Sequence, residues 1–181
     1  RFIIFLLLKL NKTFMKNYSF FSILLLVTLF FGFTTGCSKD DDQTDKNCTN
    51  FSVLDGEITI NGTKQKLSIA QFIASSNIYS FQLASVSDDC NEQKLLSITI
   101  ETATGTKLGG TYQIKDFFDA GTNQAYGDIV TQKISPVTQS AVELESGSVK
   151  ITDLGTKKYT IDVNATDITG GKTTLLLTHQ F

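Results

Sequence analysis

From residue 51 to the end of the chain, apolar and polar side chains alternate one by one, and this period of two restricts the fold more than any other feature. Tyr79, Phe81 and Leu83, for example, alternate with small or polar residues. Successive side chains of a β-strand point to opposite faces, so each such segment predicts a strand with one buried face and one wet face. The same alternation occurs at Ile58–Ile60, Leu96–Ile100, Tyr112–Ile114, Val142–Leu144, Val149–Ile151, Tyr159–Val163 and Leu175–Phe181.

Short turn sequences separate these segments. Asn61-Gly62 is a dipeptide that favours a type I′ hairpin turn, and Asp153–Thr156 and Asp167–Gly171 are also rich in turn-forming residues. Because short links join neighbouring strands in opposite directions, we expect the strands to be antiparallel. The sequence therefore predicts an all-β domain of about eight or nine strands, arranged as a β-sandwich or as a barrel.

Two segments do not follow the alternation. Leu67–Ser75 fits a short helix or a strand equally well, and Lys115–Tyr126 is the longest irregular stretch. Long loops often carry function, and aromatic rings beside acidic and amide groups suit a sugar or a small amphipathic ligand. We therefore predict a candidate ligand loop, which contains Phe117, Phe118, Asp119, Asn123 and Tyr126. The alternative is that Phe117 and Phe118 cap one end of the core.

The first 36 residues have a different composition, with no acidic side chain. The only methionine begins a short basic segment, Met15-Lys16-Asn17, and the apolar run Tyr18–Phe33 follows it. This order is typical of a secretory signal, and the run is shorter than the roughly 20 residues that span a bilayer. We expect residues 15–36 to be a cleaved signal peptide and residues 1–14 to be upstream sequence translated by mistake. The alternative is a transmembrane anchor.

The residues around Cys37 resemble a lipoprotein processing site. Thr34-Thr35-Gly36 leads to Cys37, and Ser38–Asp42 then resembles the export signal of surface lipoproteins in Bacteroidota. The resemblance implies a lipid on Cys37 that holds the protein in the outer membrane, facing the cell exterior. Residues 37–50 would then be a solvated acidic tether and residues 51–181 a single β-domain. The alternative is a lipoprotein that faces the periplasm.

A second, looser resemblance covers the last third of the chain. It is carried by Leu108–Tyr112, Ser146–Thr152, Tyr159–Ile161 and the final strand that ends at Phe181. These segments are similar to small Bacteroidota lipoproteins of uncharacterised families. The resemblance implies a lipocalin-like barrel or an antiparallel sandwich, and it implies no functional residue.

The three cysteines have different expected roles. With Cys37 assigned to the lipid, Cys48 and Cys90 remain as a pair in an oxidising compartment, so we expect them to form a disulfide bond. The alternative is two free thiols. Two cysteines and the distant His179 do not supply four zinc ligands, so we expect no metal site and no cofactor. His179 shares a face with Leu177 and Phe181, which favours a packing role over a catalytic one.

The net charge of the chain and its lack of known catalytic motifs argue against several classes of function. Four of the 16 basic residues precede Cys37, which leaves 12 basic against 18 acidic residues and a net charge near −6. An acidic domain lacks the basic surface that nucleic acid requires. The chain has no Gly-x-Ser-x-Gly sequence, and the oxygens of Asp116, Asp119, Asn123 and Asp128 do not follow calcium-loop spacing. We expect a non-enzymatic binding module for a glycan, a small ligand or a protein; the alternative is a structural or assembly accessory of an envelope complex.

Overall fold

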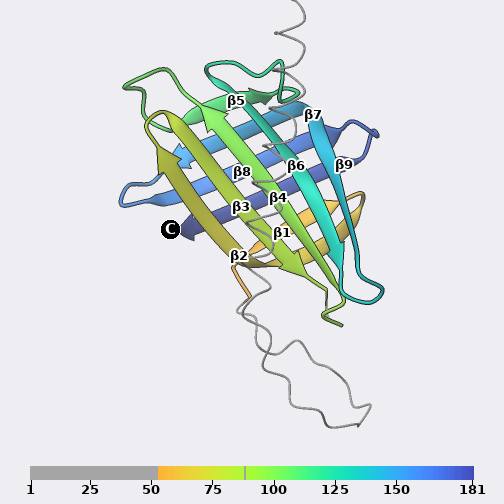
Figure 1. Ribbon diagram of the computed structural model, residues 1–181. Coiled ribbons are helices and arrows are strands. Elements are labelled where there is room, and N and C mark those ends of the chain that lie inside the picture. Colours follow the sequence, from red (N-terminus) through yellow and green to blue (C-terminus); the bar gives the residue numbers. More distant parts are fainter. Residues whose placement is uncertain (1–52, 88) are drawn as a thin grey trace, which may run out of the picture. The chain divides into compact units, whose positions relative to one another are not determined.

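The computed structural model describes residues 53–87 and 89–181, which form nine β-strands and no helix (Figure 1). None of these residues forms a helix that could cross a membrane. The predicted signal peptide, Cys37, Cys48 and the tether lie outside the described residues. The strands are β1 (Gly56–Ile60), β2 (Thr63–Ser75), β3 (Ile78–Val86), β4 (Glu92–Glu101), β5 (Gly110–Ile114), β6 (Gln124–Lys133), β7 (Thr138–Asp153), β8 (Lys158–Asp167) and β9 (Lys172–Gln180).

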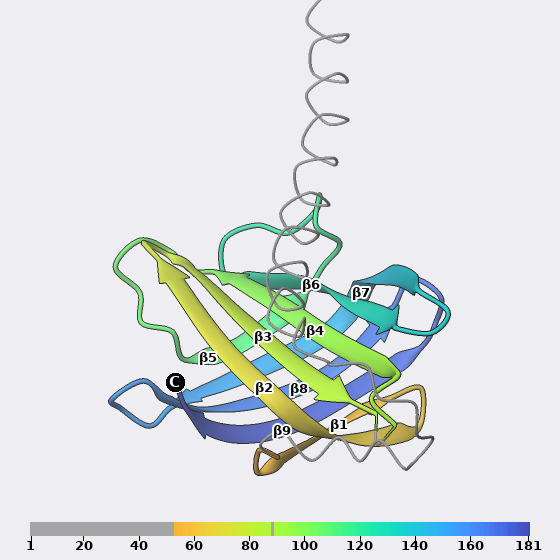
Figure 2. The same ribbon diagram turned by 60° about the horizontal axis from the view of Figure 1, so that its bottom comes forward.

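The strands form one closed barrel in the order β1-β2-β3-β4-β6-β5-β7-β8-β9, and β9 pairs with β1 to complete the ring. The all-β prediction is therefore confirmed, and of the two expected arrangements the domain adopts the barrel. Figures 1 and 2 show β2, β3, β4 and β6 on one side of it and β8 and β9 on the other. The single departure from antiparallel pairing is β5 with β6, which run in the same direction at Gln113–Gln124 and Ile114–Ala125.

Strand β5 fills only part of the space between its neighbours. It pairs with β7 from Gly110 to Gln113, whereas β6 pairs directly with β7 over Asp128–Lys133. The long strand β7 therefore has two partners on the same side, one after the other. Ring closure is maintained by β5 at one level and by the direct β6–β7 pairing at the other.

Two local features follow from the sequence in different ways. Asn61 and Gly62 have φ angles of 51° and 79°, so the turn between β1 and β2 is the predicted type I′ turn. The ambiguous segment Leu67–Ser75 is a strand, with a register shift between Leu67 and Ile69. A bulge of this kind inserts one residue and changes which side chains face inward, which explains why the segment shows no clean alternation.

The inward-facing side chains form one apolar core. Phe81, Leu83, Leu96 and Ile98 are fully buried in it, and strands across the whole ring contribute to it. At about 25 cal/mol for each Å² removed from water, burial of these side chains is the main stabilising contribution to the fold. The core lies inside the barrel.

One end of the core is aromatic. Phe72 lies 5.0 Å from Phe81, 5.2 Å from Tyr159 and 5.8 Å from Phe181, measured between ring centroids. Tilted contacts at such distances are favourable for aromatic pairs. His179 belongs to the same end, with its ring edge-on to Phe181 at 4.9 Å. The predicted packing role of His179 agrees with this position.

Candidate functional site

The candidate ligand loop connects β5 to β6 over residues 115–123. Its first turn is built by Asp116, whose Oδ1 accepts a hydrogen bond from the Phe118 N–H at 2.7 Å. The backbone carbonyl of Asp116 accepts from Asp119 at 3.0 Å and from Ala120 at 2.9 Å. An aspartate that bonds the backbone two residues ahead forms a compact turn without a helix. This turn holds the two adjacent phenylalanines in place.

Three aromatic rings meet where the loop contacts β6. Phe117 packs edge-on against Tyr126, with centroids 5.0 Å apart and planes at 80°, and against Phe118, at 5.3 Å and 81°. Such edge-to-face pairs each contribute about 0.5–1.5 kcal/mol beyond the area they bury. The predicted grouping of Phe117, Phe118 and Tyr126 is therefore present, although Tyr126 belongs to β6 and not to the loop.

These rings lie on the outer surface of the barrel. Along β6 the inward positions are Ala125, Gly127 and Ile129, which pair with the core strand β4, so Tyr126 and Asp128 point outward. Neither Phe117 nor Phe118 belongs to the core, and Phe118 is 40% exposed. The two phenylalanines therefore do not cap the core, which was the alternative to a ligand loop.

The other two residues of the predicted loop site have different positions. Asn123 has a φ angle of 63°, its N–H donates to the Glu101 carbonyl, and its Oδ1 accepts from the Ala103 N–H at 3.2 Å. This residue therefore ties the end of the loop to the segment that follows β4. Asp119 is exposed in the turn that follows Phe118.

Two carboxyl groups lie beside the aromatic cluster. Asp128 on β6 stands directly opposite Glu143 on β7, and both point outward. Burial and, to a smaller extent, the negative charge of Glu143 raise the pKa of Asp128 from its ordinary value of 3.8 to about 6. Glu143 Oε1 accepts the backbone N–H of Phe117 at 2.9 Å, so the aromatic loop and the carboxyl pair form one unit. Sequence reasoning missed this pairing.

A glycine between the two outward side chains brings the strands together. Gly127 lies between Tyr126 and Asp128, and a Cβ at this position would collide with the backbone carbonyl of Ser97 on β4. Glycine within a strand often marks such a close approach of two backbones. The close contact sets the spacing between β4 and β6 under the site.

A row of hydrogen-bonding side chains extends from Asp128 across the neighbouring strands β4 and β3. Asp128 pairs with Ser97 on β4, and Ser97 pairs with Gln82 on β3, all on the outer face. Gln82 is only 9% exposed, and its Oε1 has no hydrogen-bond partner. Buried polar atoms without a partner are rare in proteins and call for an explanation. We call this row of Gln82, Ser97, Asp128 and Glu143, with the three aromatic rings, the ligand wall.

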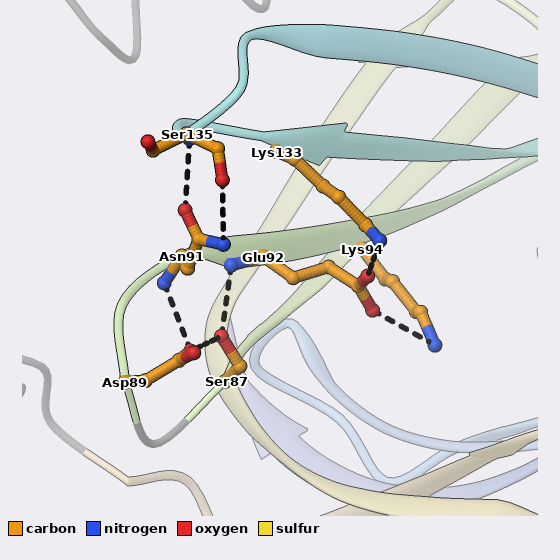
Figure 3. Close-up of polar contacts among 7 residues, drawn as sticks. All are labelled: Ser87, Asp89, Asn91, Glu92, Lys94, Lys133 and Ser135. Atoms are coloured by element: carbon orange, nitrogen blue, oxygen red, sulfur yellow. Dashed lines mark hydrogen bonds and ion pairs between the residues drawn. The ribbon is translucent and has the colours of Figure 1, made fainter.

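A separate polar network joins two turns at the other end of β4 (Figure 3). Asn91 Nδ2 donates to the Ser135 carbonyl at 3.0 Å, and the Ser135 N–H donates back to Asn91 Oδ1 at 2.8 Å. Ser87 donates to Asp89 at 2.6 Å, and this bond is the main cause that lowers the pKa of Asp89. The network is local and structural.

The charged groups next to this network are paired. Glu92 carries two lysines, Lys94 at 3.2 Å and Lys133 at 3.6 Å (Figure 3). Cys90, in the same turn, is disulfide-bonded, and the other two cysteines of the chain lie outside the described residues. The pairing of Cys90 with Cys48 stays a prediction, which peptide mapping without reduction would test.

The described residues bring together no group of three or more His, Cys, Asp or Glu side chains that could hold a metal ion. The oxygens that calcium would need are used locally, since Asp116 and Asn123 bond to backbone N–H groups. Comparison of the chain with known protein families, with curated proteins and with solved structures found no match. The chemistry of the ligand wall is therefore the basis for a functional proposal.

Proposed function

We propose that this chain is a lipid-anchored, non-enzymatic binding module that faces the cell exterior and binds a glycan or a small amphipathic ligand on the ligand wall. The anchor is the lipid on Cys37, and the ligand contacts Phe117, Phe118 and Tyr126 together with the carboxyl groups of Asp128 and Glu143. The observation that supports this proposal is the position of the aromatic cluster, which lies outside the core and beside hydrogen-bonding groups.

The three rings of the cluster are only partly buried. Aromatic residues usually contribute to stability through burial, yet the ring of Phe118 remains 40% exposed. Sugars and small amphipathic ligands bind to aromatic faces through their C–H groups and to nearby polar groups through their hydroxyls. Phe117, held by its N–H bond to Glu143, places both kinds of group side by side.

A binding assay on the processed protein, extracted from membranes in detergent, tests this function. We expect binding on a glycan array to disappear in the Phe117→Ala/Phe118→Ala variant, whereas circular dichroism melts should show that the variant remains folded with only a moderately lower melting temperature. Leu176→Ala is the matched control, because Leu176 is 63% exposed on β9 and lies away from the loop. Equal binding by the wild type and the double variant would contradict the proposal.

The anchor is tested separately. Intact-mass analysis of the membrane-extracted protein should show a chain that begins at Cys37 and carries acyl groups, and Cys37→Ser should remove them. A wild-type chain that begins before Cys37 and carries no acyl mass would contradict lipidation and leave the binding proposal to the array experiment.

A further inference from the structure

The ligand wall holds two acidic side chains that form no ion pair with the described residues. Asp128 and Glu143 lie directly opposite each other on neighbouring strands, where like charges are destabilising. The described residues form three ion pairs, which join Lys64 to Glu57 and join Lys94 and Lys133 to Glu92. Among the described residues, Glu92 therefore forms ion pairs with two lysines, whereas Asp128 and Glu143 form none.

The hydrogen bonds at the two carboxyl groups are unequal. Glu143 accepts the N–H of Phe117, whereas no hydrogen bond from a described residue reaches the Asp128 carboxyl. Across Ser97, the buried Oε1 of Gln82 also lacks a donor. The Asp128 carboxylate and the Gln82 Oε1 are both acceptors without a donor among the described residues, so a complementary ligand supplies donors and positive charge.

The aromatic rings favour the same kind of ligand. A cation within about 6 Å of a ring centroid is attracted to the ring face, and this attraction increases when water is excluded. Tyr126 precedes Asp128 by two residues on the same face of β6, and Phe117 packs on Tyr126. A single ammonium group can therefore lie near a carboxylate and an aromatic ring together.

We propose that the ligand wall binds an amino sugar, with its ammonium group between the carboxylates of Asp128 and Glu143 and its ring against Phe117 and Tyr126. Gln82 and Asp128 lie two strand spacings apart, about 10 Å. That separation exceeds the reach of one ammonium group and matches a ligand with further hydroxyl or amide donors. This inference rests on the proposed function and narrows its ligand class.

A titration with matched sugars tests the inference. The processed, detergent-extracted protein is titrated at pH 7 with glucosamine, with N-acetylglucosamine and with glucose, followed by NMR shifts or calorimetry. We expect glucosamine to bind at least about tenfold more tightly than the two neutral sugars, because a charge-assisted contact is stronger than a neutral one. Asp128→Asn and Glu143→Gln should each abolish this preference.

Asp162→Asn is the matched control, because Asp162 is an exposed, outward-facing aspartate on β8, and this variant should keep the preference. Melting curves recorded for every variant show which of them remain folded. Equal binding of all three sugars that is still lost in Phe117→Ala/Phe118→Ala would overturn the amino-sugar assignment and leave the proposed function standing. Failure of the wild type to bind glucosamine would also overturn it, as would equally tight binding of a lysine-containing peptide.

Discussion

The ligand wall and the outer surface of β8 and β9 are made from the same alternating pattern but present different chemistry. On β9 the outward residues are exposed and well separated from the buried ones, and they include Thr174, Leu176 and Thr178. On β6 the outward residues Tyr126 and Asp128 are half-buried, and an aromatic loop packs beside them. The outer surface of β8 and β9 is thus exposed to water, whereas Asp128 in the ligand wall is partly buried.

The difference shows that the ligand wall contains groups that lower the stability of the fold. Like charges on adjacent strands and an amide oxygen without a donor both destabilise a fold. On the β8–β9 surface the same residue type, Asp162, is instead exposed to solvent. Groups with a perturbed pKa concentrate at functional sites, which agrees with a binding role for the costly surface.

Among the changes at or beneath the ligand wall, the most disruptive should be Gly127→Ala. The added methyl group collides with the Ser97 carbonyl, so β4 and β6 must separate beneath the ligand wall. We expect the free energy of unfolding to fall by about 2–3 kcal/mol, measured by urea denaturation. Gly109→Ala is the control, because a Cβ there would meet no atom within 4 Å. An equal response of the two variants would show that the close approach does not matter.

Asp128→Asn should act in the opposite direction and stabilise the protein at pH 7. The raised pKa of about 6, against 3.8, corresponds to a cost of at most about 3 kcal/mol for the charged form. Because the carboxyl is partly exposed, we expect a gain of about 1–2 kcal/mol in the free energy of unfolding. Asp162→Asn, on the exposed surface, should change it by less than about 0.5 kcal/mol. A loss of stability in Asp128→Asn would contradict the uncompensated carboxyl pair.

The pH dependence of stability provides a third comparison. Between pH 4 and pH 6 the folded state binds a proton on Asp128 that the unfolded state does not, so stability increases as pH falls through this window. From pH 7 to pH 5 we expect this group to add about 1 kcal/mol. Melts of the wild type and of Asp128→Asn should differ in slope over this range. Parallel curves would rule out Asp128 as the titrating group.

Other carboxyl groups act in a different pH range. Burial acts to raise the pKa of Asp167, but hydrogen bonds from Thr169 and Gly171 outweigh it, and the pKa is lowered below 3.8. Its stabilising contribution is present above the unfolded value and is lost only as pH falls below that value. The rise expected between pH 7 and pH 5 therefore precedes the loss expected in stronger acid.

The smallest effect on stability should come from Phe118→Ala. Because 40% of this side chain is already exposed, we expect the free energy of unfolding to fall by less than about 1 kcal/mol. Phe81→Ala removes a fully buried ring of the same size and should cost about 3–5 kcal/mol. Thermal melts of the two variants would separate a surface ring from a core ring, and similar losses would place Phe118 in the core.

Much of the fold follows from the sequence, because large inward side chains mark most strands. The exceptions have physical causes. Strand β6 was not predicted at Tyr126, since its inward positions at 125 and 127 hold Ala and Gly and leave no large apolar alternation. The parallel pairing of β5 with β6 was also not predicted, because residues 115–123, which connect them, form neither a tight hairpin turn nor a helix.

The candidate site was predicted in part for a related reason. Phe117, Phe118 and Tyr126 are close in the sequence, so their grouping could be expected. Asp128 and Glu143 are separated by a full hairpin, and their contact depends on the register of β6 against β7. The sequence did contain one signal for this site. Tyr126 and Asp128 are two residues apart, and this spacing places both side chains on one face of a strand.

The tip of the loop at residues 115–123, which connects β5 to β6, can vary without breaking the barrel. Its base is fixed by Asp116 and Asn123, and β6 pairs with β7 directly beyond β5, so closure of the ring does not depend on the residues at the loop tip. Insertions or exchanges at the tip would change the binding surface and leave the hydrogen-bonded ring intact. If the domain binds a ligand as proposed, selection could vary its ligand preference at this one short segment, with little penalty to folding.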